Sequence, residues 1–179
     1  MNKRIAVIVG HSRLKNGSYT SAQGVCNEYK YNKKLSTYVV KNLRKKGYTV
    51  DRIVCPEKKF KSSKEEYNYK IPRLNSVKYD LVVELHLNAS EILTANGTEV
   101  FYYTNSKEGK KIAVQVQKQL ATLFRDRGVK QTNNLYILRD TKAVAILVES
   151  FFCTNKSDYK KANYKKVASL ISDGISKAL

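Results

Sequence analysis

Three short apolar runs, each ending in a polar side chain, constrain the fold of this chain most. They are residues 3–11 (KRIAVIVGH), 79–90 (YDLVVELHLNAS) and 143–149 (AVAILVE). Apolar runs of this length that are rich in β-branched residues are typical of buried strands. Because side chains alternate along a strand, Glu84, His86 and Asn88 are expected on one face. Each run closes on a group that can bind a metal or a proton, which indicates a functional site.

Strand and helix patterns alternate along the rest of the chain. We expect further strands at 49–54, 98–103 and 135–138, and helices at 27–46, 63–75, 107–127 and 164–178. This alternation predicts an α/β fold, a single domain over 1–179 with a mostly parallel β-sheet of about six strands flanked by helices.

Capping residues mark several of the predicted helix ends. Asn27 is a good N-cap, with Glu28 in the first turn. Ser63 followed by Glu66 is consistent with a capping box, and Pro72 either interrupts that helix or starts a second segment. Gly128 is placed to end the helix at 107–127.

The formal net charge of +19 predicts attraction to polyanions. Nucleic acid is the default partner for such a charge, but the basic residues are spread along the chain and form no aromatic-basic repeat. Anionic cell-wall polymers are an equally good electrostatic partner. Charge alone does not decide between them.

The cysteines and the apolar runs indicate a protein made in a cytosol. Cys26, Cys55 and Cys153 are widely spaced, contain no C-x-x-C pair and are expected to be reduced thiols. No apolar run approaches the roughly 20 residues of a membrane-spanning helix, so we expect no membrane insertion. The N-terminus has no secretory signal pattern, so access to a cell wall would need a permeabilised membrane.

The two histidines of the chain both follow predicted strands, and ligands of open α/β sheets bind at the carboxyl ends of strands. A catalytic zinc has three protein ligands and one open position. With His11 and His86 as two of them, Glu28 is the favoured third, because the loop after His11 can return it to the same sheet edge. Glu84 could replace it, or could hydrogen-bond a ligating histidine, and Cys26 is a further rival.

A catalytic zinc also needs a general base that takes the proton of its water. Glu149 fits this role at the end of the third apolar run, and the alternative is a salt bridge to a lysine. Asn88, on the His86 face, is a candidate either to support a metal ligand or to contact substrate.

Several sequence blocks together resemble one family. They are GHS at 10–12, NEYKYNKKL at 27–35, HLNAS at 86–90, GTEVFYY at 97–103, RGVK…LYILR at 127–139 and AILVESFFCTN at 145–155. In this order they resemble the zinc-dependent N-acetylmuramoyl-L-alanine amidases of the type 3 class. The chain looks most like the amidase domain of endolysins from phages of Gram-positive, spore-forming anaerobes.

The resemblance implies a twisted, mostly parallel sheet and one Zn²⁺ ion. It implies cleavage of the amide between N-acetylmuramic acid and L-alanine in bacterial peptidoglycan. By matching motif, the zinc ligands would be His11, Glu28 and His86, and the general base would be Glu149. The chain departs from the family pattern at several positions, among them Ser12, Arg13 and Glu84, which leaves the role of Glu84 open.

Peptidoglycan and anionic wall polymers are therefore the expected partners, with no nucleic acid, and the chain is expected to be a monomer. Many endolysins carry a wall-binding domain after the catalytic one, and none is visible in residues 1–179. Either such a domain has been removed or charge serves as the anchor. The rival functions are a zinc peptidase acting on the stem peptide, a nucleic-acid-binding module without metal, and a structural wall-binding protein.

Overall fold

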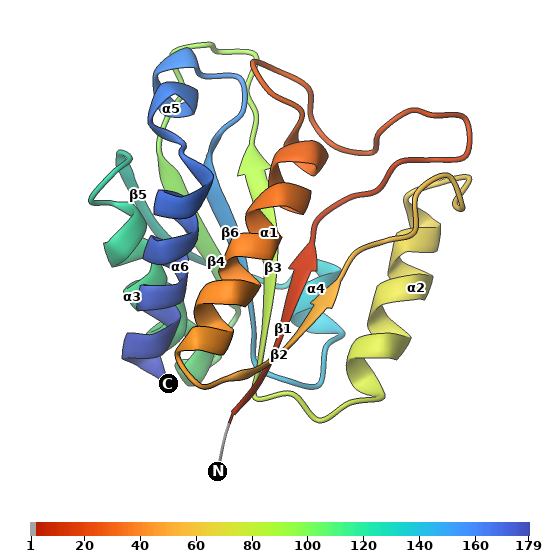
Figure 1. Cartoon of the computed structure of the whole chain (residues 1–179), viewed down its shortest axis with the longest axis vertical. Coiled ribbons are helices and arrows are strands. Elements are labelled where there is room, and N and C mark those ends of the chain that lie inside the picture. The colour runs from red at the N-terminus through yellow and green to blue at the C-terminus, as the bar shows by residue number, and fades with distance from the viewer. Residues whose placement is uncertain (1–2) are drawn as a thin grey trace.

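The computed structural model describes residues 3–179 as a six-stranded sheet with helices on both faces (Figure 1). The strands are β1 (Arg4–Val9), β2 (Thr49–Ile53), β3 (Leu81–Asn88), β4 (Thr98–Tyr103), β5 (Asp126–Thr132) and β6 (Ala145–Phe152). The helices are α1 (Glu28–Lys45), α2 (Lys64–Asn75), α3 (Lys107–Leu120), α4 (Tyr136–Arg139), α5 (Lys156–Lys161) and α6 (Tyr164–Ala178).

The sheet confirms the predicted, mostly parallel α/β architecture. Its strand order is β2-β1-β3-β6-β4-β5. All neighbouring pairs are parallel except β4 and β6, which are antiparallel. The central strands β1, β3 and β6 therefore run side by side in one direction, and their carboxyl ends meet at one edge. That edge is where open α/β sheets bind ligands.

Two apolar layers cover the sheet. The larger core lies under α1, α3 and α6, where predicted stripe residues such as Leu35, Val116 and Ile171 are buried. The smaller core lies under α2 and α4 and contains Val82 and Leu147, which alternate with residues of the larger core along β3 and β6. None of the helices in residues 3–179 has the length and apolar character needed to cross a bilayer.

The N-cap prediction for α1 is confirmed, because Asn27 Oδ1 accepts the N–H of Lys30 at 2.9 Å. The capping box predicted for α2 is wrong. Ser63 has helical backbone angles and makes no side-chain cap, and Glu66 turns its carboxylate into the protein. Pro72 lies inside α2 and does not interrupt it.

The helix predicted at 107–127 ends earlier, at Leu120. Phe124 is buried as expected, but it reaches the core from a turn, because apolar periodicity does not distinguish a last helical turn from such a turn. The residues from Asp126 instead pair with β4 as an edge strand. Gly128 has a φ of 80° inside this strand, beside a register shift, and does not end a helix.

Two other predicted elements need correction. Residues 135–138, predicted as a strand, contribute to helix α4, which buries Ile137 and Leu138 against the smaller core. A run of four apolar residues has no periodicity to separate the two structures. Strand β6 extends to Phe152, so Glu149 lies within a strand rather than at its tip.

Candidate metal centre

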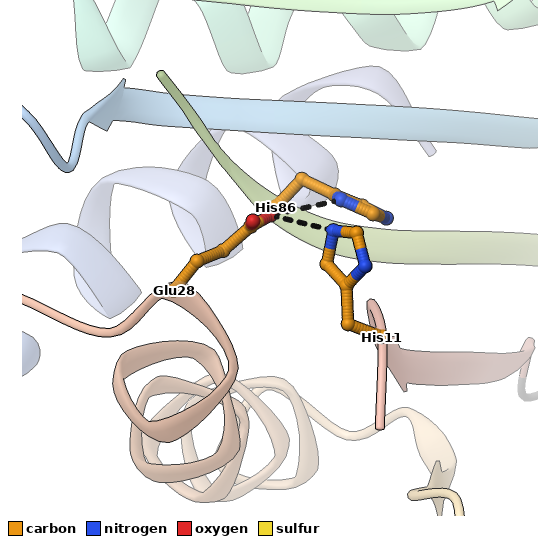
Figure 2. A group of neighbouring side chains, drawn as sticks. All are labelled: His11, Glu28 and His86. Atoms are coloured by element: carbon orange, nitrogen blue, oxygen red, sulfur yellow. Dashed lines mark hydrogen bonds and ion pairs between the residues drawn. The ribbon is translucent and has the colours of Figure 1, made fainter. Parts of the chain in front are cut away.

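His11, Glu28 and His86 bring their ligand atoms within 4.8 Å of one another (Figure 2). Glu28 Oε1 lies 3.1 Å from His11 Nε2 and 3.0 Å from His86 Nδ1. The ring centroids of the two histidines are 4.8 Å apart. The three residues predicted as ligands therefore converge on one point at the carboxyl edge of the sheet.

Gly10 makes room for this convergence. A Cβ atom added at Gly10 would lie 2.4 Å from two atoms of the His86 ring, so the imidazole packs directly over the glycine. The next residue, His11, has a left-handed φ of 64°, which is uncommon outside glycine. This turn after β1 directs the His11 ring toward His86 instead of continuing the strand.

Glu28 is held at the amino end of α1 by two backbone donors. Its Oε1 accepts the N–H of Leu87 and its Oε2 accepts the N–H of Ala22, each at 3.0 Å. Burial alone would raise the pKa of the Glu28 carboxyl, but the contacts with His11 and His86 outweigh burial and hold that pKa well below its usual range. Glu28 is therefore an ionised oxygen donor oriented before any ligand arrives.

Glu149 pairs in register with His86 across β3 and β6, so both side chains lie on the same face. The residue as a whole is half-buried, but its Oε2 atom is buried and has no hydrogen-bond partner within residues 3–179. Burial raises the pKa of Glu149 to about 8; the carboxylates of Glu28 and Glu99 add to this, and His86 opposes it. A carboxyl group with such a pKa can take up and release a proton near neutral pH.

Glu84 contacts the opposite side of His86 from Glu28. Its Oε2 lies 3.2 Å from His86 Nε2, and its Oε1 accepts a hydrogen bond from Lys70 Nζ at 2.8 Å. Burial would raise the pKa of Glu84, but Lys70 and His86 outweigh it and hold this pKa well below its usual range. Glu84 does not belong to the converging donor group.

The other two candidates have different surroundings. Cys26 also lies outside the converging group, and burial raises the pKa of its thiol to about 12, which disfavours the thiolate that binds metals. Asn88 donates to Glu99 Oε1 at 2.8 Å, on the same sheet face as His86.

Sequence reasoning missed the contribution of α2 to this centre. Glu66 and Lys70 are buried, and they line a pocket of about 330 Å³ together with both histidines, Thr20 and Tyr136. Their signal in the sequence is a spacing of four residues. In a highly charged segment, that spacing normally indicates a solvent-exposed pair.

The donor set suits a catalytic zinc ion. Two imidazole nitrogens and one carboxylate oxygen are a usual set of three protein ligands, which leaves a coordination position for water or substrate. The His11 side chain is 26% exposed, so the centre is open to solvent on that side. The carboxyl group of Glu149 lies on the same sheet face as His86, where it can exchange a proton.

Known proteins share this fold and much of this sequence. The family described as N-acetylmuramoyl-L-alanine amidase matches residues 5–179. The solved catalytic domain of the CD27L endolysin, which targets Clostridia difficile, has 49% sequence identity and a TM-score of 0.95, covering 98% of each chain.

Two longer curated proteins match part of their length. The N-acetylmuramoyl-L-alanine amidase LytC of Bacillus subtilis (strain 168) is 38% identical over 113 residues, which are 59% of this chain and 23% of LytC. The probable cell wall amidase LytH of Staphylococcus aureus is 26% identical over 156 residues, 87% of this chain and 50% of LytH. The chain thus spans half or less of the length of these two relatives.

Proposed function

Because the chain belongs to the N-acetylmuramoyl-L-alanine amidase family, we propose that it hydrolyses the amide bond between N-acetylmuramic acid and L-alanine in peptidoglycan. The observation that carries this proposal is the convergence of His11, Glu28 and His86 beside Glu149, whose buried Oε2 has no hydrogen-bond partner within residues 3–179. Likeness to the catalytic domain of an endolysin supports a role in bacterial cell lysis.

Zinc is the ion that we assign to this donor set, with His11, Glu28 and His86 as its ligands. When bound, zinc supplies Lewis-acid polarisation of the scissile carbonyl group and a lowered pKa of the attacking water. Glu28 would contribute a carboxylate oxygen, and its contacts with both histidines already keep its pKa low in the metal-free protein.

Glu149 is the general base and then the general acid. It takes a proton from the water that attacks the carbonyl carbon, and it later gives this proton to the nitrogen of L-alanine as the C–N bond breaks. In the metal-free protein, burial raises its pKa to about 8, so the Glu149 side chain lies in surroundings that favour its protonated form, which is the form it takes between the two steps. Hydrolysis by this route leaves a free lactyl carboxylate and a new amino terminus on L-alanine.

Anionic wall polymers are the partner that the net charge of +19 supports. Attraction between exposed charges is screened by salt over a Debye length of about 10 Å at 0.1 M. Adsorption to purified walls should therefore weaken as the salt concentration rises. Adsorption that is equal at low and high salt would argue against anchoring by charge.

The test of the reaction is end-group analysis of Gram-positive peptidoglycan digested by the zinc-loaded protein. New amino-terminal L-alanine without new reducing sugar ends supports the amidase. New amino termini on other residues would instead indicate a zinc peptidase that cuts the stem peptide. A matched digest with chelator-treated protein should release no new ends, and end groups released equally with and without zinc would contradict the zinc assignment.

A further inference from the structure

We propose that helix α2 positions both zinc-binding histidines through Glu66 and Lys70. In this arrangement the ring proton lies on Nε2 of His86 and on Nδ1 of His11, so the two histidines offer different ring nitrogens to the metal. The inference rests on the zinc site proposed above and concerns how that site is held. Glu66 and Lys70 stand four residues apart, so both project from one face of α2. They are charged and yet only 5% and 1% exposed. This part of α2 is therefore a polar support beneath His11 and His86.

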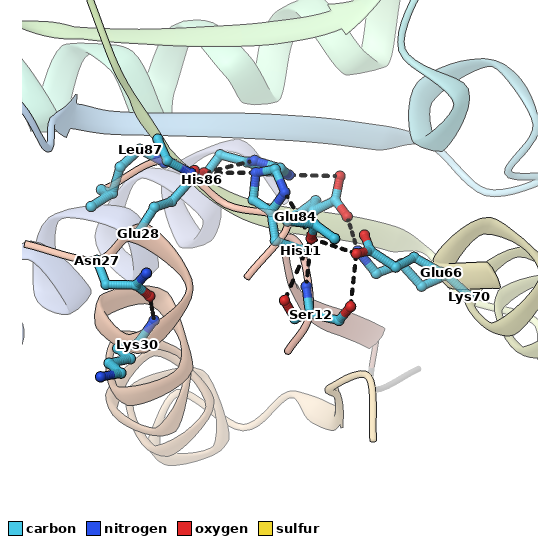
Figure 3. A network of polar contacts seen from close by, with 12 residues as sticks. His11, Ser12, Asn27, Glu28, Lys30, Glu66, Lys70, Glu84, His86 and Leu87 are labelled. Carbon is cyan, nitrogen blue, oxygen red and sulfur yellow. Dashed lines mark hydrogen bonds and ion pairs between the residues drawn. The ribbon is translucent and has the colours of Figure 1, made fainter. Parts of the chain in front are cut away.

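The branch from Lys70 reaches His86 through Glu84 (Figure 3). Lys70 Nζ donates to Glu84 Oε1 at 2.8 Å, and Glu84 Oε2 lies 3.2 Å from His86 Nε2. The other ring nitrogen, Nδ1, lies 3.0 Å from Glu28 Oε1. His86 Nε2 is buried and makes no hydrogen bond within residues 3–179, so the Glu84 carboxylate beside it acts as a charge partner. This carboxylate stabilises a proton on Nε2 electrostatically, and His86 therefore offers Nδ1 to the metal.

The branch from Glu66 reaches His11 through Thr20. The Thr20 hydroxyl donates to Glu66 Oε1 at 2.5 Å, and its oxygen lies 3.5 Å from His11 Nδ1. Because the single hydroxyl proton is given to Glu66, this oxygen acts toward the ring only as an acceptor from Nδ1–H. His11 therefore offers Nε2, which lies 3.1 Å from Glu28 Oε1.

Glu66 also secures the turn that carries His11. Ser12, which follows the left-handed His11, is fully buried, and its hydroxyl donates to Glu66 Oε1 at 2.8 Å. The Ser12 N–H donates to Thr20 Oγ1 at 3.0 Å. One carboxylate on α2 thus holds the turn directly and the His11 ring through Thr20.

The first test is the dissociation constant for zinc, measured by competition with a chromogenic chelator. Thr20→Val removes the hydroxyl beside His11, and Lys70→Met/Glu84→Gln removes both charges of the other branch together. In neither variant is Lys70 or Glu84 left as a buried charge without its ion-pair partner. We expect zinc binding about 10- to 100-fold weaker for each, the usual effect of losing a residue that orients a ligand. The controls Lys64→Met and Glu65→Gln, on the same helix, should bind zinc as wild type does.

Variants that fold and bind zinc as tightly as wild type would overturn the inference. A wild-type protein that binds no zinc would instead overturn the zinc site of the proposed function, so the two failures are distinguishable.

The second test reads the ring protons directly by ¹⁵N NMR of the zinc-loaded wild-type protein. The chain has two histidines, so the ring signals are few. We expect the proton on Nε2 of His86 and on Nδ1 of His11. A proton on the same nitrogen in both rings would overturn the inference, even if the variants weakened zinc binding for some other structural reason.

Discussion

Two glutamates on the same sheet face, Glu84 and Glu149, lie close to His86 and have opposite surroundings. Glu84 is bonded to the buried ammonium group of Lys70, whereas Glu149 has a buried oxygen with no hydrogen-bond partner among the described residues. The pKa of Glu84 is held well below its usual range, and that of Glu149 is raised to about 8. Burial raises both pKa values, but Lys70 and His86 lower that of Glu84, whereas neighbouring carboxylates raise that of Glu149 further.

This comparison separates two roles for the same side chain. A carboxylate that orients a ligand must stay ionised, and Lys70 ensures that for Glu84. The general base that we propose at Glu149 must exchange its proton near the working pH, and the absence of a hydrogen-bond partner for its Oε2 within residues 3–179 suits this role. The role that we propose for each glutamate thus follows from its neighbours and not from its residue type.

Glu149→Gln should have the largest effect on activity. It removes the proton-exchanging group while keeping the shape of the side chain. We expect hydrolysis of peptidoglycan to fall about 10²- to 10⁴-fold, the usual contribution of general acid–base catalysis. Zinc content, measured by elemental analysis, should stay at the wild-type level. A Gln variant with near-wild-type turnover would remove Glu149 from the mechanism.

Lys70→Met tests the other glutamate by making its surroundings resemble those of Glu149. Glu84 would then be buried without its cation, and removing one partner of a buried ion pair costs about 3–5 kcal/mol. Urea denaturation of the metal-free protein should show this loss of unfolding free energy. The control Lys64→Met, at the exposed start of α2, should show little change. Equal stability of both variants would mean that Lys70 does not support Glu84.

Gly10→Ala is expected to displace the ring of His86, which lies close to both Glu84 and Glu149. The added methyl group would lie 2.4 Å from the His86 ring, so the ring must leave its place or the strand must shift. Overpacking of this kind costs about 1–3 kcal/mol. We expect weaker zinc binding with the secondary structure retained, measured by chelator competition and circular dichroism. Unchanged zinc affinity would show that the His86 ring can move more freely than its close packing against Gly10 suggests.

The smallest expected effect is on the pH dependence of the unfolding free energy of the metal-free protein. The folded-state pKa of Glu149 is about 8, above its ordinary value of 4.5, so between these values the folded state holds a proton that the unfolded state has released. This contribution to stability is complete below pH 4.5 and is lost as the pH rises toward 8 and above. The slope is at most about 1.4 kcal/mol per pH unit.

The pH effect is measured as the difference between wild type and Glu149→Gln. Urea midpoints taken from pH 5 to 9 in the presence of chelator should fall more steeply for wild type. His86, whose pKa is also raised, contributes a slope of the same sign, and Glu149 is one of the carboxylates that raise the His86 pKa. The difference between the two proteins therefore reports Glu149 together with its effect on His86. Parallel curves would mean that the pKa of Glu149 is not raised.

The sequence by itself determined the sheet, the face and the ligand candidates. Apolar runs of this length that are rich in β-branched residues favour buried strands, and strand alternation then puts Glu84, His86 and Asn88 on one face. The loop after His11 does return Glu28 to the same edge, as expected. Prediction from the sequence failed where local patterns carry little information, as in the polar edge strand β5 and the short helix α4.

Only the tertiary structure decided what each polar side chain does. Glu66 was predicted to cap its own helix, and it bonds Ser12 and Thr20, at least 46 positions away in the chain. Lys70 was part of a charged segment, and it is the buried partner of Glu84. A local pattern reports the neighbours along the chain, whereas ionisation and orientation depend on neighbours in space. Those neighbours exist only once α2 has packed against the sheet.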